Sequence, residues 1–325
     1  MKALVFNEYG MADVLKCEEV AKPIHTDEQV LVKVHAASIN SWDWELLRGV
    51  PFANRLMAGL FKPKKIRIPG CDIAGRVEAV GKNVKQFKPG DEVFGDLSGG
   101  SWGGFAEYTC AREHELAFKP SAMTFVQAAA IPQAGLLALQ ALHKGKIQPG
   151  KKVLINGASG GSGTFAIQIA KSYGAEVTGV CSTNKTELVY LLGADHVIDY
   201  SREDFTKNGQ HYDLVIDAKA FHSIPDYWRT LSADGVYVIY GGAMSRIFQV
   251  ILLGPLLSGI SKKKLCLLIH KPDVGDLNTM ATLFIQGKVI PVIDQCFSLA
   301  NGTAAMRYYG EGKAKGKVVI NMVSE

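Results

Sequence analysis

A glycine-rich turn between a buried strand and an amphipathic helix constrains this chain more than any other feature. Apolar residues 153–155 and Asn156 lead into Gly157, Ala158, Ser159, Gly160, Gly161, Ser162 and Gly163, and a helix-like segment continues to Lys171. Glycine allows a tight turn and a close backbone approach, and the start of a helix offers unpaired N–H groups to an anion. The pattern therefore predicts a phosphate-binding site for a dinucleotide, with a plain strand-to-helix turn as the alternative.

The segments around this turn alternate between the strand and helix periods. Strands are expected at 152–156, 176–181, 197–200, 214–218, 236–240 and 264–269, with helices at 163–173, near 185–192 and near 224–231. Continuous apolar strands that alternate with helices predict a parallel sheet covered on both faces. The fold class is therefore α/β, with a doubly wound parallel sheet.

The first 120 residues follow a different pattern, with short strands separated by glycine and proline turns, which is typical of a β-barrel. A helical turn is expected at 40–49. The chain ends in a strand at 292–297, a helix at 299–310 and a strand at 317–322, and we expect this tail to return to the barrel. The predicted domains are 1–122 with 271–325 for the barrel and 123–270 for the nucleotide-binding sheet.

Composition and charge exclude several other classes. The net charge is +5 and the basic residues are scattered, so no nucleic-acid-binding stripe is expected. Six cysteines without a C-x-x-C pair give no sign of a disulfide framework or a structural zinc lobe, and a reducing, cytoplasmic setting is expected. The N-terminus does not resemble a secretory signal. The apolar run Ile247–Ile260 is shorter than the ~20 residues of a spanning helix. We expect it to be a core or partner-facing segment, with peripheral membrane contact left open by the three lysines that follow.

The end of the second nucleotide-sheet strand bears on the choice of cofactor. NAD-binding folds usually place an acid about 20 residues past the glycines, to bind the ribose 2′-hydroxyl. Here Ser182, Thr183 and Lys185 stand in that region instead. Hydroxyl donors and a cation suit a 2′-phosphate, which favours NADP(H), and the alternative is a polar helix cap.

With these segments placed, the whole chain resembles the medium-chain dehydrogenase/reductase superfamily, and most closely its zinc-free quinone oxidoreductase branch, which includes zeta-crystallin. The resemblance lies in motifs of characteristic order and spacing, at 37–43, 68–75, 80–81, 87–93, 103–108, 130–135, 193–200 and 316–319. It implies a GroES-like β-barrel joined to a Rossmann domain, with the active site in the cleft between them. It also implies a homodimer, with Lys264–Ile269 as the pairing edge, and NADPH-dependent reduction of a quinone or an α,β-unsaturated carbonyl.

The resemblance also addresses the metal question. Zinc-dependent relatives place a cysteine, a histidine–glutamate pair and a further cysteine where Asn40, Cys71–Asp72 and Gln133 stand in this chain. A catalytic zinc needs about three N or S ligands, so we expect no metal and interpret Cys71 as a buried small residue.

Further roles follow from the resemblance. Asn40 is expected near the nicotinamide as a positioning group or hydrogen-bond donor. Asp43 is either a proton donor or a structural cap, and Trp42 and Trp102 are expected at the substrate cleft, with packing on the barrel as the alternative for Trp102. Tyr200 and Lys317 are expected near the cofactor phosphates. The alternative for Tyr200 is a half-buried aromatic at a strand end, and the alternative for Lys317 is a solvated lysine at a strand edge. The remaining expected contacts flank the ribose and nicotinamide: Gly241, Gly242 and Ile269.

The sequence leaves three rival functions open. A zinc alcohol dehydrogenase would require the missing ligands, whereas an enoyl-thioester reductase shares the scaffold and differs only in substrate. A crystallin-like protein that binds NADPH without turnover is the alternative from a different class. No acid–base relay can be singled out, which leaves solvent as a source of the proton.

Overall fold

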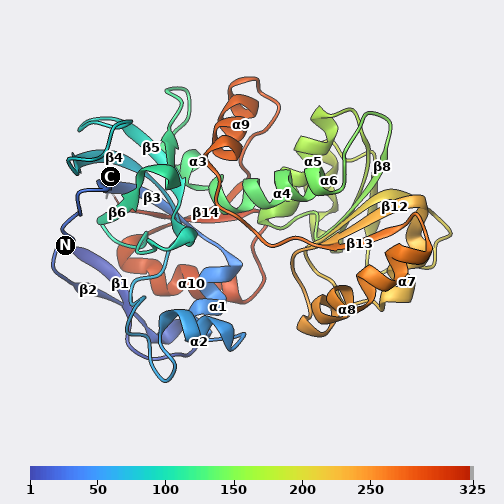
Figure 1. Cartoon of the computed structure of the whole chain (residues 1–325), viewed down its shortest axis with the longest axis horizontal. Coiled ribbons are helices and arrows are strands. Elements are labelled where there is room, and N and C mark those ends of the chain that lie inside the picture. The colour runs from blue at the N-terminus through green and yellow to red at the C-terminus, as the bar shows by residue number, and fades with distance from the viewer. Residues whose placement is uncertain (323–325) are drawn as a thin grey trace. The chain divides into compact units, whose positions relative to one another are not determined.

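The computed structural model describes residues 1–322 and divides into two compact units (Figure 1). The first unit comprises 1–134, 271–286 and 291–325, and the second comprises 135–270 and 287–290. The expected boundary at 122 lies too early. Helix α3 (Phe125–Ala129) packs against strands β3 and β4 of the first unit, so the segment up to Ala134 belongs to the barrel.

The first unit is built on a seven-stranded, mostly antiparallel sheet. Its strand order is β14-β15-β3-β4-β5-β7, and β6 also pairs with β3. The long strand β3 is central because it pairs with β4, β6 and β15. The strands are β3 (Gln29–Ile39), β4 (Asp72–Val80), β5 (Glu92–Asp96), β6 (Tyr108–Arg112), β7 (Leu116–Phe118), β14 (Ile293–Ser298) and β15 (Lys317–Asn321), with a separate pair β1 (Lys2–Phe6) and β2 (Leu15–Glu19).

The last strand of the chain lies inside the first unit. Strand β15 pairs antiparallel with β3, with Val319 opposite Ser38, and parallel with β14. This confirms that the C-terminal segment returns to the barrel and that the nucleotide-type sheet is an insertion. The helices of this unit are α1 (Ser41–Arg48), α2 (Ala53–Ala58), α3, α9 (Val274–Ile285) and α10 (Gly302–Gly310).

The second unit contains a six-stranded parallel sheet of order β10-β9-β8-β11-β12-β13. The chain starts at β8 in the middle and winds outward on both sides, so the expected doubly wound architecture is confirmed. The strands are β8 (Lys152–Asn156), β9 (Glu176–Cys181), β10 (His196–Asp199), β11 (Tyr212–Asp217), β12 (Leu231–Ile239) and β13 (Lys264–Leu267), and the helices are α4 (Pro132–Lys144), α5 (Gly161–Ser172), α6 (Thr186–Leu191), α7 (Ile224–Thr230) and α8 (Met244–Ile260).

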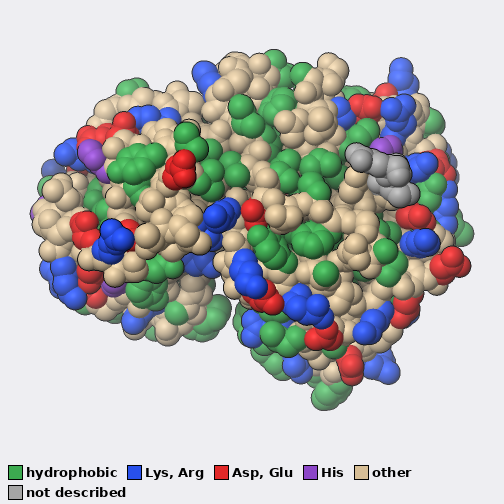
Figure 2. Space-filling model, turned by 180° about the vertical axis from the view of Figure 1, so that it is seen from behind, with side chains coloured by type: hydrophobic (Ala, Val, Ile, Leu, Met, Phe, Trp, Pro, Cys, Tyr) green, Lys and Arg blue, Asp and Glu red, His purple; other side chains and the backbone are tan. Residues whose placement is uncertain are grey.

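The apolar run at 247–260 forms most of helix α8, which connects β12 to β13. Among the described residues, no helix is long and apolar enough to cross a membrane. Lys and Arg side chains are mixed with Asp and Glu over the face drawn in Figure 2, and they do not gather into a single stripe there.

Candidate active site

The glycine-rich turn forms between β8 and α5, as the sequence predicts. Gly157 has a φ of +87°, a left-handed conformation that favours glycine. A Cβ on Gly163 would overlap the carbonyl oxygen of Gly157, so the helix packs against the turn too closely for any other residue. Gly160 has an ordinary φ of −81°, and its Cβ would lie 3.3 Å from the same oxygen. The fold therefore requires Gly157 and Gly163, whereas the missing side chain of Gly160 leaves room for a ligand.

The other predicted cofactor residues of the second unit follow the carboxyl ends of the same sheet. Residues 182–185 follow β9, Tyr200 follows β10, Gly241 and Gly242 follow β12, and Ile269 follows β13. Tyr200 and Ile269 are exposed, so Tyr200 is not the half-buried aromatic of the alternative interpretation. In doubly wound sheets the carboxyl edge is where dinucleotides bind. The helix start, the glycines and the flanking polar groups fit a dinucleotide phosphate.

An acid that the sequence pattern did not reveal, Asp199, lies beside the end of β9. Thr183 donates its hydroxyl to Asp199 Oδ2 at 2.5 Å and also lies 3.2 Å from the Ser201 hydroxyl. Asp199 ends the neighbouring strand β10, opposite Cys181. Hydrogen bonds from Thr183 and Ser201 hold the pKa of Asp199 below its usual value, and Arg202 lies 3.5 Å from its carboxylate. The acid was missed because it is adjacent through parallel strand pairing and not through sequence.

A buried carboxylate is hydrogen-bonded to the residue that directly precedes the glycine-rich turn. Asp217, at the end of β11, accepts a hydrogen bond from Asn156 Nδ2 at 2.8 Å and one from the Tyr237 hydroxyl at 3.0 Å. Burial raises the pKa of Asp217. The Ser162 hydroxyl lies 2.9 Å from the Tyr240 hydroxyl, which ties the start of α5 to the end of β12. A polar residue that ends an otherwise apolar strand is the signal that could have identified Asn156 and Asp217.

The predicted catalytic residue Asn40 lies in a buried polar cluster of the first unit. Lys317 Nζ donates to Asn40 Oδ1 and lies 3.4 Å from Asp72 Oδ2. Asp72 also accepts hydrogen bonds from the Ser38 hydroxyl at 2.9 Å and the Gln133 backbone N–H at 3.0 Å. Lys317 is 2% exposed, which rules out the solvated edge lysine of the alternative interpretation. Its expected contact with the cofactor phosphates stays a prediction.

This cluster forms because three chain segments meet at the centre of the sheet. Asn40 directly follows β3, Asp72 begins β4 opposite Ser38, and Lys317 begins β15. Lys317 donates to the oxygen of the Asn40 amide, so it fixes the orientation of that amide. Asn40 Nδ2 lies 3.5 Å from both Ser38 O and Cys71 Sγ, and the Asn40 side chain also hydrogen-bonds the Asp72 carboxylate and lowers the pKa of Asp72. The Asn40 amide is therefore held on its oxygen by Lys317 and on its nitrogen by Asp72.

Asp43 is a capping residue of helix α1. Its carboxylate accepts hydrogen bonds from the backbone N–H groups of Asn40 at 2.8 Å and Gly70 at 2.9 Å. Burial raises the pKa of Asp43 to about 7, although both hydrogen bonds oppose the shift. The structural-cap alternative thus describes its contacts, and proton donation by Asp43 stays a prediction.

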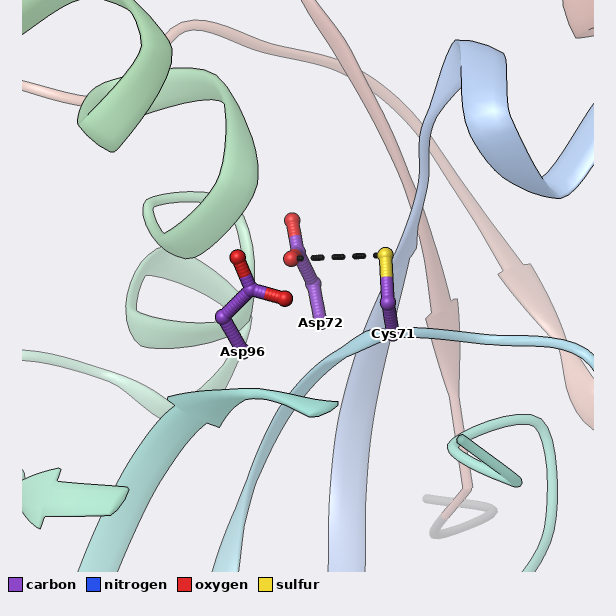
Figure 3. Close-up of side chains that lie close together, drawn as sticks. All are labelled: Cys71, Asp72 and Asp96. Carbon is purple, nitrogen blue, oxygen red and sulfur yellow. Dashed lines mark hydrogen bonds between the residues drawn. The ribbon is translucent and has the colours of Figure 1, made fainter. Parts of the chain in front are cut away.

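Cys71, Asp72 and Asp96 place three ligand-type atoms within 4.8 Å of one another (Figure 3). Figure 3 shows the Cys71 thiol directed at Asp72, to which it donates at 3.8 Å. This donor set contains one sulfur and no histidine, and Asp72 is already paired with Lys317. Burial raises the pKa of Cys71 well above its usual value, and neighbouring carboxylates add to the shift. These residues do not fit a catalytic zinc, which takes about three N or S ligands.

The two tryptophans predicted at the substrate cleft lie together. Their rings meet edge to face at 5.5 Å between centroids. Trp102 is 2% exposed and packs within the core of the first unit, as the barrel-packing alternative expects. Trp42 is partly exposed and donates its indole N–H to Asn54 Oδ1 at 3.1 Å. Of the pair, Trp42 therefore has the greater surface available to a ligand.

Comparison with family models gives two matches. Residues 26–121 match the alcohol dehydrogenase GroES-like domain, and residues 192–320 match the zinc-binding dehydrogenase model. The first match covers most of the strands of the barrel unit. The second runs from the third strand of the parallel sheet into the final strand of the chain.

Individual proteins resemble nearly the whole chain. The human mitochondrial NAD(P)H oxidoreductase RTN4IP1 is 33% identical, over 99% of this chain and 89% of its own length. The 2-methylene-furan-3-one reductase of Solanum lycopersicum is 36% identical, over 99% of this chain and 79% of its own. The quinone oxidoreductase structure from Coxiella burnetii superposes with a TM-score of 0.90 at 30% identity and covers 99% of both chains.

Proposed function

This chain belongs to the quinone-oxidoreductase branch of the medium-chain dehydrogenase/reductase superfamily, and from that premise we propose that it is an NADPH-dependent reductase. The acceptor would be a quinone or an α,β-unsaturated carbonyl. Support comes from relatives whose names specify a quinone or an enone as substrate. When bound, the nicotinamide supplies the hydride, and the protein has to orient the acceptor and stabilise its developing negative oxygen.

The observation that carries the proposal is the contact between Lys317 and the oxygen of the Asn40 amide. The ammonium group polarises the amide and directs its N–H groups away from Lys317. An acceptor oxygen placed against Asn40 Nδ2 would receive a hydrogen bond from a donor that is already oriented. Such preorganised donors commonly contribute about 100-fold or more to a rate.

We propose NADPH over NADH because of the residues that follow β9. Lys185 offers a positive charge for a 2′-phosphate, while the Ser182 and Thr183 hydroxyls donate to Asn184 and Asp199 and would have to turn to reach it. Asp199 would repel that phosphate, but its carboxylate is occupied by Thr183, Ser201 and Arg202. The balance between the charges of Lys185 and Asp199 decides whether NADPH or NADH binds better. Both cofactors are therefore tested with every acceptor.

We further propose that the reaction does not use zinc. The ammonium group of Lys317 lies beside Asp72, where a divalent cation would be repelled. Elemental analysis of the purified protein after exchange into metal-free buffer tests this directly. Zinc at one equivalent that supports activity would refute it.

Steady-state oxidation of the nicotinamide cofactor tests the activity. The assay follows NADPH and NADH absorbance with naphthoquinones, enals, an enoyl thioester and a simple ketone as acceptors. We expect turnover with the first two classes and a preference for NADPH. Turnover with the thioester alone would assign an enoyl-thioester reductase, and the absence of turnover with every acceptor would favour a binding protein.

We also propose that the protein is a homodimer formed through strand β13. Within the described residues β13 pairs only with β12, so its outer edge offers the backbone groups of Leu267 to a second copy, whereas the Leu265 N–H on that edge lies 3.4 Å from Ser258 Oγ of α8. Sedimentation equilibrium tests this, and a Leu267→Pro substitution should dissociate the dimer because proline removes a donor on the outer edge, whereas the neighbouring Leu268 N–H faces β12. A monomer at every concentration would refute it.

A further inference from the structure

Helix α8 is apolar on both of its sides. Ile247, Val250, Gly254 and Leu257 form the inward stripe, and the three apolar side chains among them pack against the core of the second unit. A Cβ on Gly254 would lie 2.9 Å from the Leu265 carbonyl oxygen, so the helix contacts β13 at close range. This stripe accounts for the burial of the helix on its sheet side.

The outward side of α8 is also apolar, although it is exposed. Phe248, Ile251, Leu252 and Leu256 are 57%, 48%, 70% and 68% exposed. Their spacing of three and four residues places them on one side of the helix. A surface helix of a water-soluble protein carries polar residues at these positions, and a helix that is apolar all round is normally covered.

The charged residues of the segment that contains α8 have one sign. No aspartate or glutamate occurs between Asp234 and Asp273, whereas Arg246, Lys262 and Lys264 lie on or next to the helix. Lys262 and Lys264 are exposed, while Lys263 is held by the protein through the Trp228 carbonyl oxygen at 2.9 Å. An apolar surface bordered by exposed lysines is a combination that binds to anionic lipid surfaces.

We propose that the outward side of α8 docks on an anionic membrane surface, with Phe248, Ile251, Leu252 and Leu256 inserted and Lys262 and Lys264 at the headgroups. A second copy of the chain is a poorer occupant. A two-fold contact through this side would bring the same basic residues of both copies together without acids from this segment. Helix α8 also adjoins the outer edge of β13, where the Leu265 N–H lies 3.4 Å from Ser258 Oγ, so sedimentation is needed to separate self-association through this side from lipid docking.

Vesicle flotation of the full-length protein tests this inference. Vesicles of phosphatidylcholine with phosphatidylglycerol should carry the protein, vesicles of phosphatidylcholine alone should carry much less, and added salt should reduce binding. The double substitution Leu252→Gln/Leu256→Gln should lower partitioning at least about tenfold. Lys262→Glu/Lys264→Glu should abolish the preference for anionic lipid.

Matched substitutions elsewhere provide the controls. Tyr190→Gln/Leu191→Gln changes two exposed apolar residues of α6, and Lys85→Glu/Lys88→Glu changes two exposed lysines of the first unit. Both should bind vesicles like the unaltered protein. The inference is overturned if anionic vesicles fail to bind, or if the α8 substitutions bind as well as these controls. It is also overturned if the α8 leucines support only self-association, measured by sedimentation. Flotation needs no turnover, so its result is independent of the proposed activity.

Discussion

Replacing Lys317 by methionine would leave Asp72 as a buried carboxylate without its cation. Methionine keeps much of the length and the apolar stem of lysine, so packing changes little. At 3.4 Å and an effective dielectric constant of about 20, the lost attraction is about 5 kcal/mol. Removal of one partner from a buried ion pair typically costs about 3–5 kcal/mol. We therefore expect Lys317→Met to lower the free energy of unfolding by about 3–5 kcal/mol at pH 8.

The penalty should depend on pH, with a definite sign. Burial raises the pKa of Asp72 and Lys317 opposes that shift, so loss of Lys317 raises this pKa further. The folded variant then keeps a proton that the unfolded chain has released above a pH of about 4. Its unfolding free energy must fall as pH rises. The difference between the variant and the unaltered protein should therefore be larger at pH 8 than at pH 5.

Urea unfolding followed by tryptophan fluorescence provides the assay, because Trp42, Trp44 and Trp102 all belong to the first unit. Lys119→Met is a matched control, since Lys119 is also buried but pairs with the partly exposed Glu92 at 2.9 Å. Lys119 holds the pKa of Glu92 low. Even without Lys119, Glu92 is mostly ionised from pH 5 to pH 8. The unfolding free energy that Lys119→Met loses should therefore depend little on pH.

The double variant Asp72→Asn/Lys317→Met should recover part of the loss, because it removes the uncompensated charge. A cost for Lys317→Met below about 1 kcal/mol, or an equal cost at both pH values, would refute the assigned role of the pair.

The remaining predictions concern the cofactor turn and the residues around Asn40. Lys185→Ala should weaken NADPH binding about tenfold more than NADH binding, measured by fluorescence titration, and equal losses would contradict the 2′-phosphate assignment. Gly160→Val should weaken cofactor binding more than about tenfold with little change in stability, whereas Gly163→Ala should destabilise the second unit in urea because its Cβ has no space. Asn40→Ala should lower turnover about 100-fold while cofactor affinity changes little, and an unchanged rate would remove Asn40 from the site. Because burial raises the pKa of Asp43 to about 7, the folded state keeps a proton that the unfolded state loses above a pH of about 4. Stability should therefore fall from pH 5 to pH 8, and less steeply in Asp43→Asn; equal slopes would contradict this.

Local patterns predicted the strands and helices of the second unit well, because each element there has its own period and its own turn signals. Strand β9 occupies the expected 176–181, and α5 starts two residues before the expected 163. The barrel was harder to predict. Strands β2, β6 and β7 are held by pairing with distant partners, and their own sequences contain no regular alternation.

The residues of the candidate site also fall into two groups, those that a local pattern predicts and those that strand pairing brings together. The glycine turn was evident from sequence because its chemistry is local. The contacts of Asn40 with Lys317, of Asp72 with Ser38 and of Thr183 with Asp199 depend on strand pairing, which a single sequence does not reveal. Lys317 was expected near the cofactor phosphates, and only the register of β15 against β3 shows that it lies beside Asn40.

The position of Lys317 in the last strand also affects how the protein is made. Ribosomes synthesise Asp43 and Asp72 long before Lys317, which compensates their charge, and the 135–270 segment emerges between them. That segment contains all six strands of its sheet, so it can complete its sheet while the barrel still lacks β14 and β15. The nascent chain thus holds these carboxylates without their cation until β15 has been synthesised. Release of a chain that ends before residue 317 would yield a nucleotide-type sheet attached to a barrel without its charge balance.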